Sequence, residues 1–141
     1  MIRKFELKDI DEVMSIWLNT NISAHIFIDK LHWENAYDTV KSLLPLSDLF
    51  VWTDSNTIKA FVGITDNSYI AGLFVDVHYQ SQGIGKQLLA YAKSQYSKLE
   101  LDVFAENDGA IRFYQRNGFA VTQTKMNFDF NHEEYHMVWS A

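Results

Sequence analysis

Residues 69–96 hold the clearest pattern of apolar and polar positions in the chain. The apolar run Ile70–Val75, with its aromatic and branched side chains, is typical of a short strand. A polar loop that contains Gly83 and Gly85 follows it. Apolar residues then recur at helical spacing, which predicts a helix with one buried face made of Ile84, Leu88, Leu89, Ala92 and Tyr96. The segment therefore predicts a strand, a glycine loop and a helix in succession.

The N-terminal part of the chain predicts one short strand at 2–5 and then a helix. Asp9 and Glu12 have the spacing of a capping box, so we expect their side chains to bond the first N–H groups of this helix. The polar residues 19–21 are expected to end it. Its buried face is expected to consist of Ile10, Val13, Met14, Trp17 and Leu18.

A loop with apolar side chains is expected at 23–28, before a second helix that runs from about Leu31 to Leu44. Pro45, the only proline, stops that helix. Short runs rich in branched and aromatic residues predict the remaining strands at 49–53, 58–65, 99–104, 119–128 and 134–139, with Asn131 and His132 in the last turn.

Three features of the second half refine this outline. Gly72 interrupts the central strand, and a glycine inside a strand often marks a bulge. Asn107 opens a short helix that carries Tyr114, and Gly118 stands where a left-handed helix cap would sit. The strands at 49–53, 58–65 and 69–75 are expected to form an antiparallel meander. The whole pattern predicts an α+β fold.

Composition limits the classes of protein that fit. The chain has 141 residues, of which 48% are hydrophobic, so we expect one domain over residues 1–141 with a well-filled core. There is no cysteine, which excludes disulfides and a cysteine nucleophile, and the five histidines lack zinc-binding spacing. No membrane-spanning or leader segment is seen, so a cytoplasmic protein is expected. The net charge of −6 argues against a nucleic-acid partner and is compatible with an amine substrate.

The glycine loop predicts an anion site. Glycine permits backbone angles that turn successive N–H groups toward one point, and the first N–H groups of a helix carry the positive end of its dipole. Such loops bind phosphates. No Lys-Ser or Lys-Thr follows the glycines at Walker spacing, and the third glycine of a dinucleotide fingerprint is missing. A turn that merely needs glycine is the alternative.

Two motifs carry a resemblance to a known family. Gln80-x-x-Gly83-x-Gly85 resembles the acyl-CoA pyrophosphate loop of the GNAT superfamily of N-acetyltransferases. Asn107-x-x-Ala110-Ile111-x-Phe113-Tyr114-x-x-x-Gly118-Phe119 resembles the second cofactor segment of the same superfamily. The two motifs occur in the family's order, and the predicted elements follow the order of the GNAT fold.

The resemblance implies a central, mostly antiparallel mixed sheet of about seven strands with four helices. The fourth and fifth strands are expected to splay apart, and the pantetheine arm of acetyl-CoA to lie in the gap. The co-substrate is thus acetyl-CoA, and no metal is expected. The residues that the resemblance assigns to its binding are Leu73, Val75, Gln80, Gln82, Gly83, Ile84, Gly85, Lys86, Asn107 and Phe113.

Three residues are candidates for chemistry by the same resemblance, and each has a structural alternative. Tyr114 matches the tyrosine whose hydroxyl approaches the CoA sulfur; otherwise it is a core aromatic. Asp102 lies where one branch of the family has a glutamate proposed as general base, but it is shorter and would act through water; otherwise it is a solvated carboxylate. His25 lies in a segment that borders the acceptor site and could bind or deprotonate the substrate; otherwise it is packed. Asn107 could be only a helix cap.

The function implied is transfer of acetyl from acetyl-CoA to a primary amine by direct attack in a ternary complex. The acceptor is either a protein amine, N-terminal or lysine, or a small-molecule amine. A non-catalytic acyl-CoA sensor is the alternative from another class, and an RNA acetyltransferase would need a basic face that the sequence does not indicate. The protein is expected to be a monomer or a homodimer.

Overall fold

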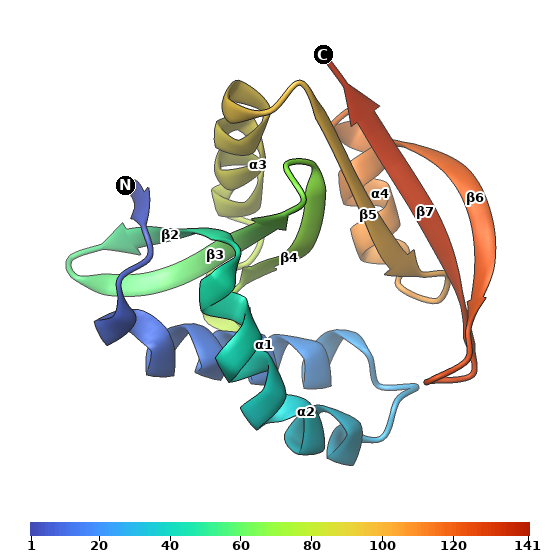
Figure 1. Cartoon of the computed structure of the whole chain (residues 1–141), viewed down its shortest axis with the longest axis horizontal. Coiled ribbons are helices and arrows are strands. Elements are labelled where there is room, and N and C mark those ends of the chain that lie inside the picture. The colour runs from blue at the N-terminus through green and yellow to red at the C-terminus, as the bar shows by residue number, and fades with distance from the viewer.

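The computed structural model describes residues 1–141 and contains one mixed sheet of seven strands in the order β1-β2-β3-β4-β5-β7-β6 (Figure 1). All neighbouring strands are antiparallel except β4 and β5, which are parallel. The α+β fold and the meander of β2, β3 and β4 are as predicted. The strands are β1 Ile2–Lys4, β2 Asp48–Asp54, β3 Thr57–Thr65, β4 Tyr69–Val75, β5 Lys98–Phe104, β6 Ala120–Asn127 and β7 His132–Ser140.

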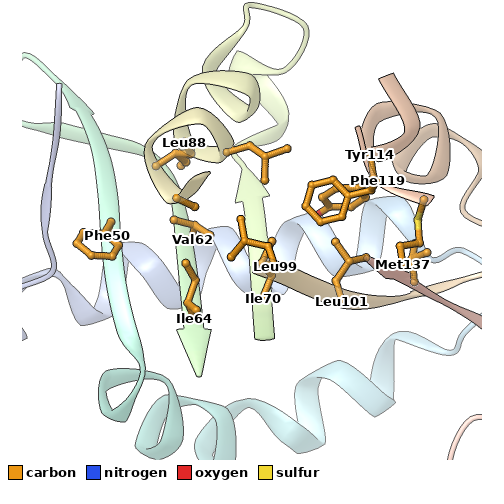
Figure 2. Packing of buried hydrophobic residues seen from close by; sticks show 14 of the residues in the cluster. Phe50, Val62, Ile64, Ile70, Leu88, Leu99, Leu101, Tyr114, Phe119 and Met137 are labelled. Atoms are coloured by element: carbon orange, nitrogen blue, oxygen red, sulfur yellow. The ribbon is translucent and has the colours of Figure 1, made fainter. Parts of the chain in front are cut away.

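Four α-helices cover the sheet from its two sides (Figure 1). They are α1 Ile10–Ala24, α2 Lys30–Leu43, α3 Ile84–Gln95 and α4 Asp108–Arg116, and the short 3-10 turns are η1 Leu7–Asp9, η2 Leu44–Leu46 and η3 Val77–Tyr79. Alternation along β3 separates two cores: Val62 packs with the α3 and α4 side, whereas Phe61 packs with α1 and α2. Figure 2 shows the first core, where Leu88 of α3 and Tyr114 of α4 meet the sheet.

The sheet opens between β4 and β5. The two strands pair only at Tyr69 and Glu100, near the start of β4, and then diverge (Figure 1). The register of β3 against β4 also shifts beside Gly72, so Ala71 is left unpaired in a bulge. The predicted splay and the predicted bulge are both present. The divergence leaves room between two neighbouring strands.

The start of α1 differs from the prediction of a capping box. The Asp9 carboxylate accepts a hydrogen bond from the Glu6 N–H at 2.8 Å and pairs with Arg3, so it serves η1 rather than α1. The Glu12 carboxylate lies 3.2 Å from the Ile58 N–H of β3 and accepts from it. The predicted box was therefore wrong, because both carboxylates found partners outside the helix.

The end of α1 also differs from the prediction. Residues 19–21 do not stop the helix, which continues to Ala24. The Thr20 hydroxyl donates to the Ile16 carbonyl at 2.6 Å, and the Asn21 amide donates to the Trp17 carbonyl at 2.8 Å. Their polar groups are thus satisfied within the helix, and these residues need no turn of their own. At the other end of the chain, His132 already belongs to β7 rather than to the preceding turn.

Candidate active site

The loop between β4 and α3 is built by one left-handed glycine. Gly83 has φ +82° and is the N-cap of α3, so the first N–H groups of that helix emerge beside it. The Gln80 side chain donates to the Val75 carbonyl at 3.0 Å and fastens the loop to the end of β4. Gly85, by contrast, has no positive φ; a Cβ there would lie 3.4 Å from Phe113 and 3.5 Å from Val75. These are ordinary contact distances, so the packing around Gly85 leaves room for a Cβ.

A cleft of about 800 Å³ lies against this loop. It is bounded by the end of α1, the second half of β4, the start of α3 and the face of α4. Most of the residues assigned to the cofactor by resemblance line it: Leu73, Val75, Gln80, Gly83, Ile84, Gly85, Lys86, Asn107 and Phe113. Gln82 does not line it and is exposed. The Ile84 side chain is buried in the core, so only its backbone is available to the cleft.

The backbone of β4 faces the cleft where the sheet opens. The Asp76 N–H donates to the Lys59 carbonyl of β3 at 2.8 Å. Backbone groups alternate in direction along a strand, so those of Val75 and Leu73 are directed away from β3, into the gap beside β5. Two residues at the end of β4 thus offer strand-like hydrogen-bonding groups without a strand beside them.

A second cavity of about 190 Å³ lies on the other side of the same opening. Asp102 lines this cavity and not the larger cleft. Six residues line both: His25, Leu73, Phe74, Asn107, Ala110 and Tyr114. The two spaces therefore meet between the end of α1, β4 and the start of α4, where His25, Asn107 and Tyr114 are the polar side chains.

Tyr114 is buried at this junction, with 8% of its surface exposed. Its ring packs against Phe113 and Phe119, and its hydroxyl has no hydrogen-bond partner in the protein. Burial raises the pKa of Tyr114 well above its ordinary value, so the hydroxyl keeps its proton. A protonated phenol without a partner is available as a hydrogen-bond donor.

His25 is also buried, and it contacts the cap of α4. Its Nε2 lies 3.2 Å from Nδ2 of Asn107, whose Oδ1 accepts from the Ala110 N–H. The side-chain amide of Asn107 therefore donates to the imidazole, which must be neutral to accept. Burial lowers the pKa of His25, and the Asn21 backbone opposes this only weakly. His25 Nδ1 and the indole N–H of Trp33 are buried without a hydrogen bond of normal geometry.

Three polar side chains contact Asp102: Tyr69 and Lys125 are donors, and His136 donates when its Nδ1 carries a proton. The Tyr69 hydroxyl lies 2.7 Å from its Oδ2, and His136 Nδ1 and Lys125 Nζ lie 2.8 Å and 3.0 Å from its Oδ1. Burial favours the neutral carboxyl, but the hydrogen bonds from Tyr69, His136 and Lys125 outweigh it and lower the pKa of Asp102. Asp102 is therefore an anion at the wall of the smaller cavity. The sequence did not single out Tyr69 or His136, although strand alternation puts His136 directly opposite Asp102 once β5 and β7 are paired.

The charges at the two cavities differ in sign. Lys86 and Arg116 line the larger cleft, and Arg116 was not predicted. Asp102 and Glu134 line the smaller cavity. The larger cleft thus suits an anion and the smaller one a cation. No group of three or more histidine, aspartate or glutamate side chains is arranged to hold a metal ion. None of the helices combines the length and the apolar character that crossing a membrane requires.

Residues 25–137 match a family model described as an acetyltransferase (GNAT) domain. The chain belongs to the GNAT family of acetyltransferases. It is 30% identical over 122 residues to the peptidyl-lysine N-acetyltransferase YiaC of Escherichia coli strain K12, a match that covers 86% of this chain and 84% of that protein. The family and the acetyl-CoA-dependent N-acetyltransferase activity predicted from the sequence are thereby confirmed.

Solved GNAT structures have the same fold. The apo form of YjaB from Escherichia coli superposes with a TM-score of 0.87 at 23% identity, over 99% of this chain and 96% of that one. The PaiA N-acetyltransferase of Thermoplasma acidophilum, solved in complex with coenzyme A, gives a TM-score of 0.84 at 20% identity, over 100% and 98% of the two chains. The predicted GNAT fold, with its seven strands and four helices, is confirmed.

Proposed function

We propose that this GNAT enzyme acetylates the ε-amine of lysine side chains in proteins. Acetyl-CoA would occupy the larger cleft, and the lysine would enter through the smaller cavity. The observation that carries this assignment is the meeting of a cationic cleft and an anionic cavity at Tyr114. The relatives YiaC and YjaB of Escherichia coli, both peptidyl-lysine N-acetyltransferases, support a lysine acceptor.

The cofactor residues divide into two groups by position. The N–H groups from Gln82 to Lys86, at the start of α3, would hold the pyrophosphate, because helix N-termini bind anions. The backbone of Leu73 and Val75 would bond the pantetheine arm in the gap of the sheet, with Asn107 and Phe113 on the opposite wall. Gln80 would act indirectly, because its amide is already bonded to the Val75 carbonyl.

The chemistry would be direct attack of the amine on the thioester. The chain has no cysteine, and no covalent acyl-enzyme is needed. The Val75 N–H would polarise the thioester carbonyl, and the Tyr114 hydroxyl would donate to the departing sulfur. Asp102 would attract the lysine ammonium, and His25 would shape the junction through Asn107. Holding the amine against the carbonyl accounts for a large part of such a rate enhancement.

We extend the proposal to the domain organisation, the location in the cell and the partners of the protein. Residues 1–141 form a single catalytic domain that acts in the cytoplasm as a monomer or a homodimer, without a nucleic-acid or membrane partner. The net charge of −6 is compatible with protein substrates that present lysine on a basic surface.

The test is a comparison of acceptors at fixed acetyl-CoA. One peptide has a blocked N-terminus and a single lysine; the second has a free α-amine and arginine in place of lysine; the third acceptor is a small diamine. Product is identified by mass spectrometry, and turnover is followed by thiol release. We expect acetyl-lysine in the first peptide and a lower kcat/KM for the other two. Preferential acetylation of the α-amine or of the diamine would overturn the lysine assignment, and no turnover on any acceptor would favour an acyl-CoA sensor.

A further inference from the structure

Side chains from three strands form one hydrogen-bonded chain that reaches the smaller cavity at Asp102. Tyr69 lies at the start of β4, Glu100 and Asp102 lie on β5, and His136 lies on β7. The links are Tyr69 hydroxyl to Asp102 at 2.7 Å, Asp102 to His136 Nδ1 at 2.8 Å, and His136 Nε2 to Glu100 at 3.1 Å. Asp102 is the member of this chain that lines the cavity.

The contacts of His136 suit an imidazole that gains a proton. Each ring nitrogen faces a carboxylate oxygen, and a carboxylate accepts hydrogen bonds but does not donate them. A neutral imidazole can donate to only one of the two oxygens. An imidazolium donates to both at once, so the site stabilises the ring after it has received a proton.

Asp102 alone is too weak a base to keep the proton of a lysine ammonium. A lysine amine with a pKa near 10.4 is almost entirely protonated at neutral pH, so its proton must be removed before the amine can attack. The donors around Asp102 lower its pKa, so this carboxylate attracts an ammonium well but holds a proton poorly. A group that can retain the proton is needed next to it.

We propose that His136 is that group: it receives the proton of the acceptor ammonium through Asp102 and so acts as a positioning residue for catalysis. The proposal rests on the assignment of a lysine acceptor given above. The Asp102 carboxylate touches the substrate, whereas His136 lies behind it and lines neither cavity. Its side chain is 19% exposed, which gives the proton an exit to water.

Protons and electrons balance over one turnover. An N–H bond of the ammonium breaks as an O–H bond forms on Asp102. A proton then leaves Asp102 for Nδ1 of neutral His136, whose own hydrogen is on Nε2 and is donated to Glu100. The amine lone pair forms the C–N bond, and the C–S bond breaks with its electron pair on sulfur. The second amine proton is then taken up by the thiolate, which the Tyr114 hydroxyl stabilises as a hydrogen-bond donor while it departs. The His136 imidazolium then releases its proton to solvent.

The charges around His136 favour transfer without trapping the proton. Glu100 and Asp102 on β5, and Glu134 two residues away on β7, favour the charged ring. Lys125 on β6 and Lys98 on β5 pair with Asp102 and Glu100 and oppose it. The Tyr69 hydroxyl on β4 is neutral, because burial and Asp102 raise its pKa. The Ser68 hydroxyl donates to Glu100 at 3.0 Å and holds that carboxylate in place.

The test is the pH dependence of kcat for the variant His136→Gln on the blocked lysine peptide. For the parent enzyme we expect kcat to rise with pH and then level off, because the enzyme itself supplies an acceptor for the proton. The variant must lose its proton to water, so its kcat should be about 10- to 100-fold lower near neutral pH and should keep rising without a plateau. His132→Gln is the matched control, because His132 is also on β7 and pairs with a carboxylate, Glu106, at 2.8 Å outside both cavities. It should keep the parent profile.

A second measurement does not depend on turnover. The ring of His136 is titrated by NMR in the parent enzyme and in Asp102→Asn, which removes one of its two carboxylates. We expect the midpoint to move to lower pH in the variant. An unmoved midpoint, or a His136→Gln profile with the parent plateau, overturns the proposal. If acetyl-lysine is not formed at all, the lysine assignment fails instead, and the titration still decides whether Asp102 and His136 are coupled.

Discussion

At the scale of single residues, Tyr114 lies where the proposed acetyl donor and amine acceptor meet. It lines both cavities, and its hydroxyl makes no hydrogen bond to another protein group. We take the pKa of the CoA thiol to resemble that of a cysteine, about 8.5. Full proton transfer to the thiolate from a tyrosine with an ordinary pKa near 10 would then cost about 2 kcal/mol. Burial raises the pKa of Tyr114 and adds to this cost. The hydroxyl should therefore act as a hydrogen-bond donor that strengthens as charge grows on sulfur.

Tyr114→Phe tests this role because it removes only the donor and keeps the ring packing. An interaction made mainly in the transition state affects kcat rather than binding. We expect kcat to fall by about 10- to 1,000-fold with CoA affinity nearly unchanged. Steady-state kinetics and calorimetry on the same preparation give both quantities. Tyr91→Phe, which deletes a hydroxyl from a ring packed on Phe50, is the control. A kcat within about twofold of the parent would make Tyr114 a packing residue only.

The site residues differ in how far sequence could predict them. Asn107 and Tyr114 lie in one local motif, so their positions followed from a helix cap and helical spacing. The hydrogen bond between Asp102 and His136 joins residues 34 apart, and it depends on β7 lying beside β5 in a particular register. A one-residue shift would turn His136 to the other face. Local patterns do not determine that register, so Tyr69 and His136 could not be predicted.

At the scale of elements, the loop before α3 decides whether the cleft can hold a phosphate. Gly83 combines φ +82° with open space, since no atom lies within 4 Å of the position that a Cβ would take. A side chain there meets backbone strain and enters the region in front of the first N–H groups of α3. The sequence predicted this loop because glycine spacing and helical periodicity are local. It did not predict the true length of α1, because the satisfaction of Thr20 and Asn21 by their own helix is a side-chain detail.

Gly83→Val should therefore weaken CoA binding more than it harms folding. We expect affinity to fall at least about tenfold, or about 1.4 kcal/mol, and stability to fall by about 1–2 kcal/mol from the left-handed backbone. Calorimetry with CoA and urea unfolding measure the two effects. Asn56→Val is the matched control, because Asn56 also has a positive φ, 66°, but lies in the turn between β2 and β3, away from the cleft. Equal losses of CoA affinity in both variants would show that strain alone is responsible.

At the scale of the whole molecule, the sheet's opening divides the chain into two packed halves. β4 and β5 share one paired position, so few backbone hydrogen bonds join the halves. Aromatic contacts add to the shared core in connecting them: Phe104, at the end of β5, packs against His25 at 5.1 Å and Phe27 at 5.6 Å between ring centroids, and Phe130 stacks on Trp33 of α2 at 5.4 Å. His25 adds a polar link to Asn107. The joint between the halves is thus largely aromatic, and it includes the titratable ring of His25, which is buried, and that of His132.

This joint should make stability depend on pH. Burial lowers the pKa of His25 from its ordinary value of 6.5. Below about pH 6.5, the His25 ring therefore binds a proton more readily in the unfolded chain than in the folded protein. The unfolding free energy should therefore be fully retained above about pH 6.5 and should fall as the pH drops toward the lowered folded pKa. His25→Phe keeps an aromatic ring in the cluster but cannot titrate. Urea unfolding from about pH 8 to about pH 5 should show the difference in unfolding free energy, parent minus variant, constant above about pH 7 and decreasing below it. A difference that stays constant across the whole range would mean that His25 takes up its proton as readily in the folded protein as in the unfolded chain, and that the joint is not sensitive to pH.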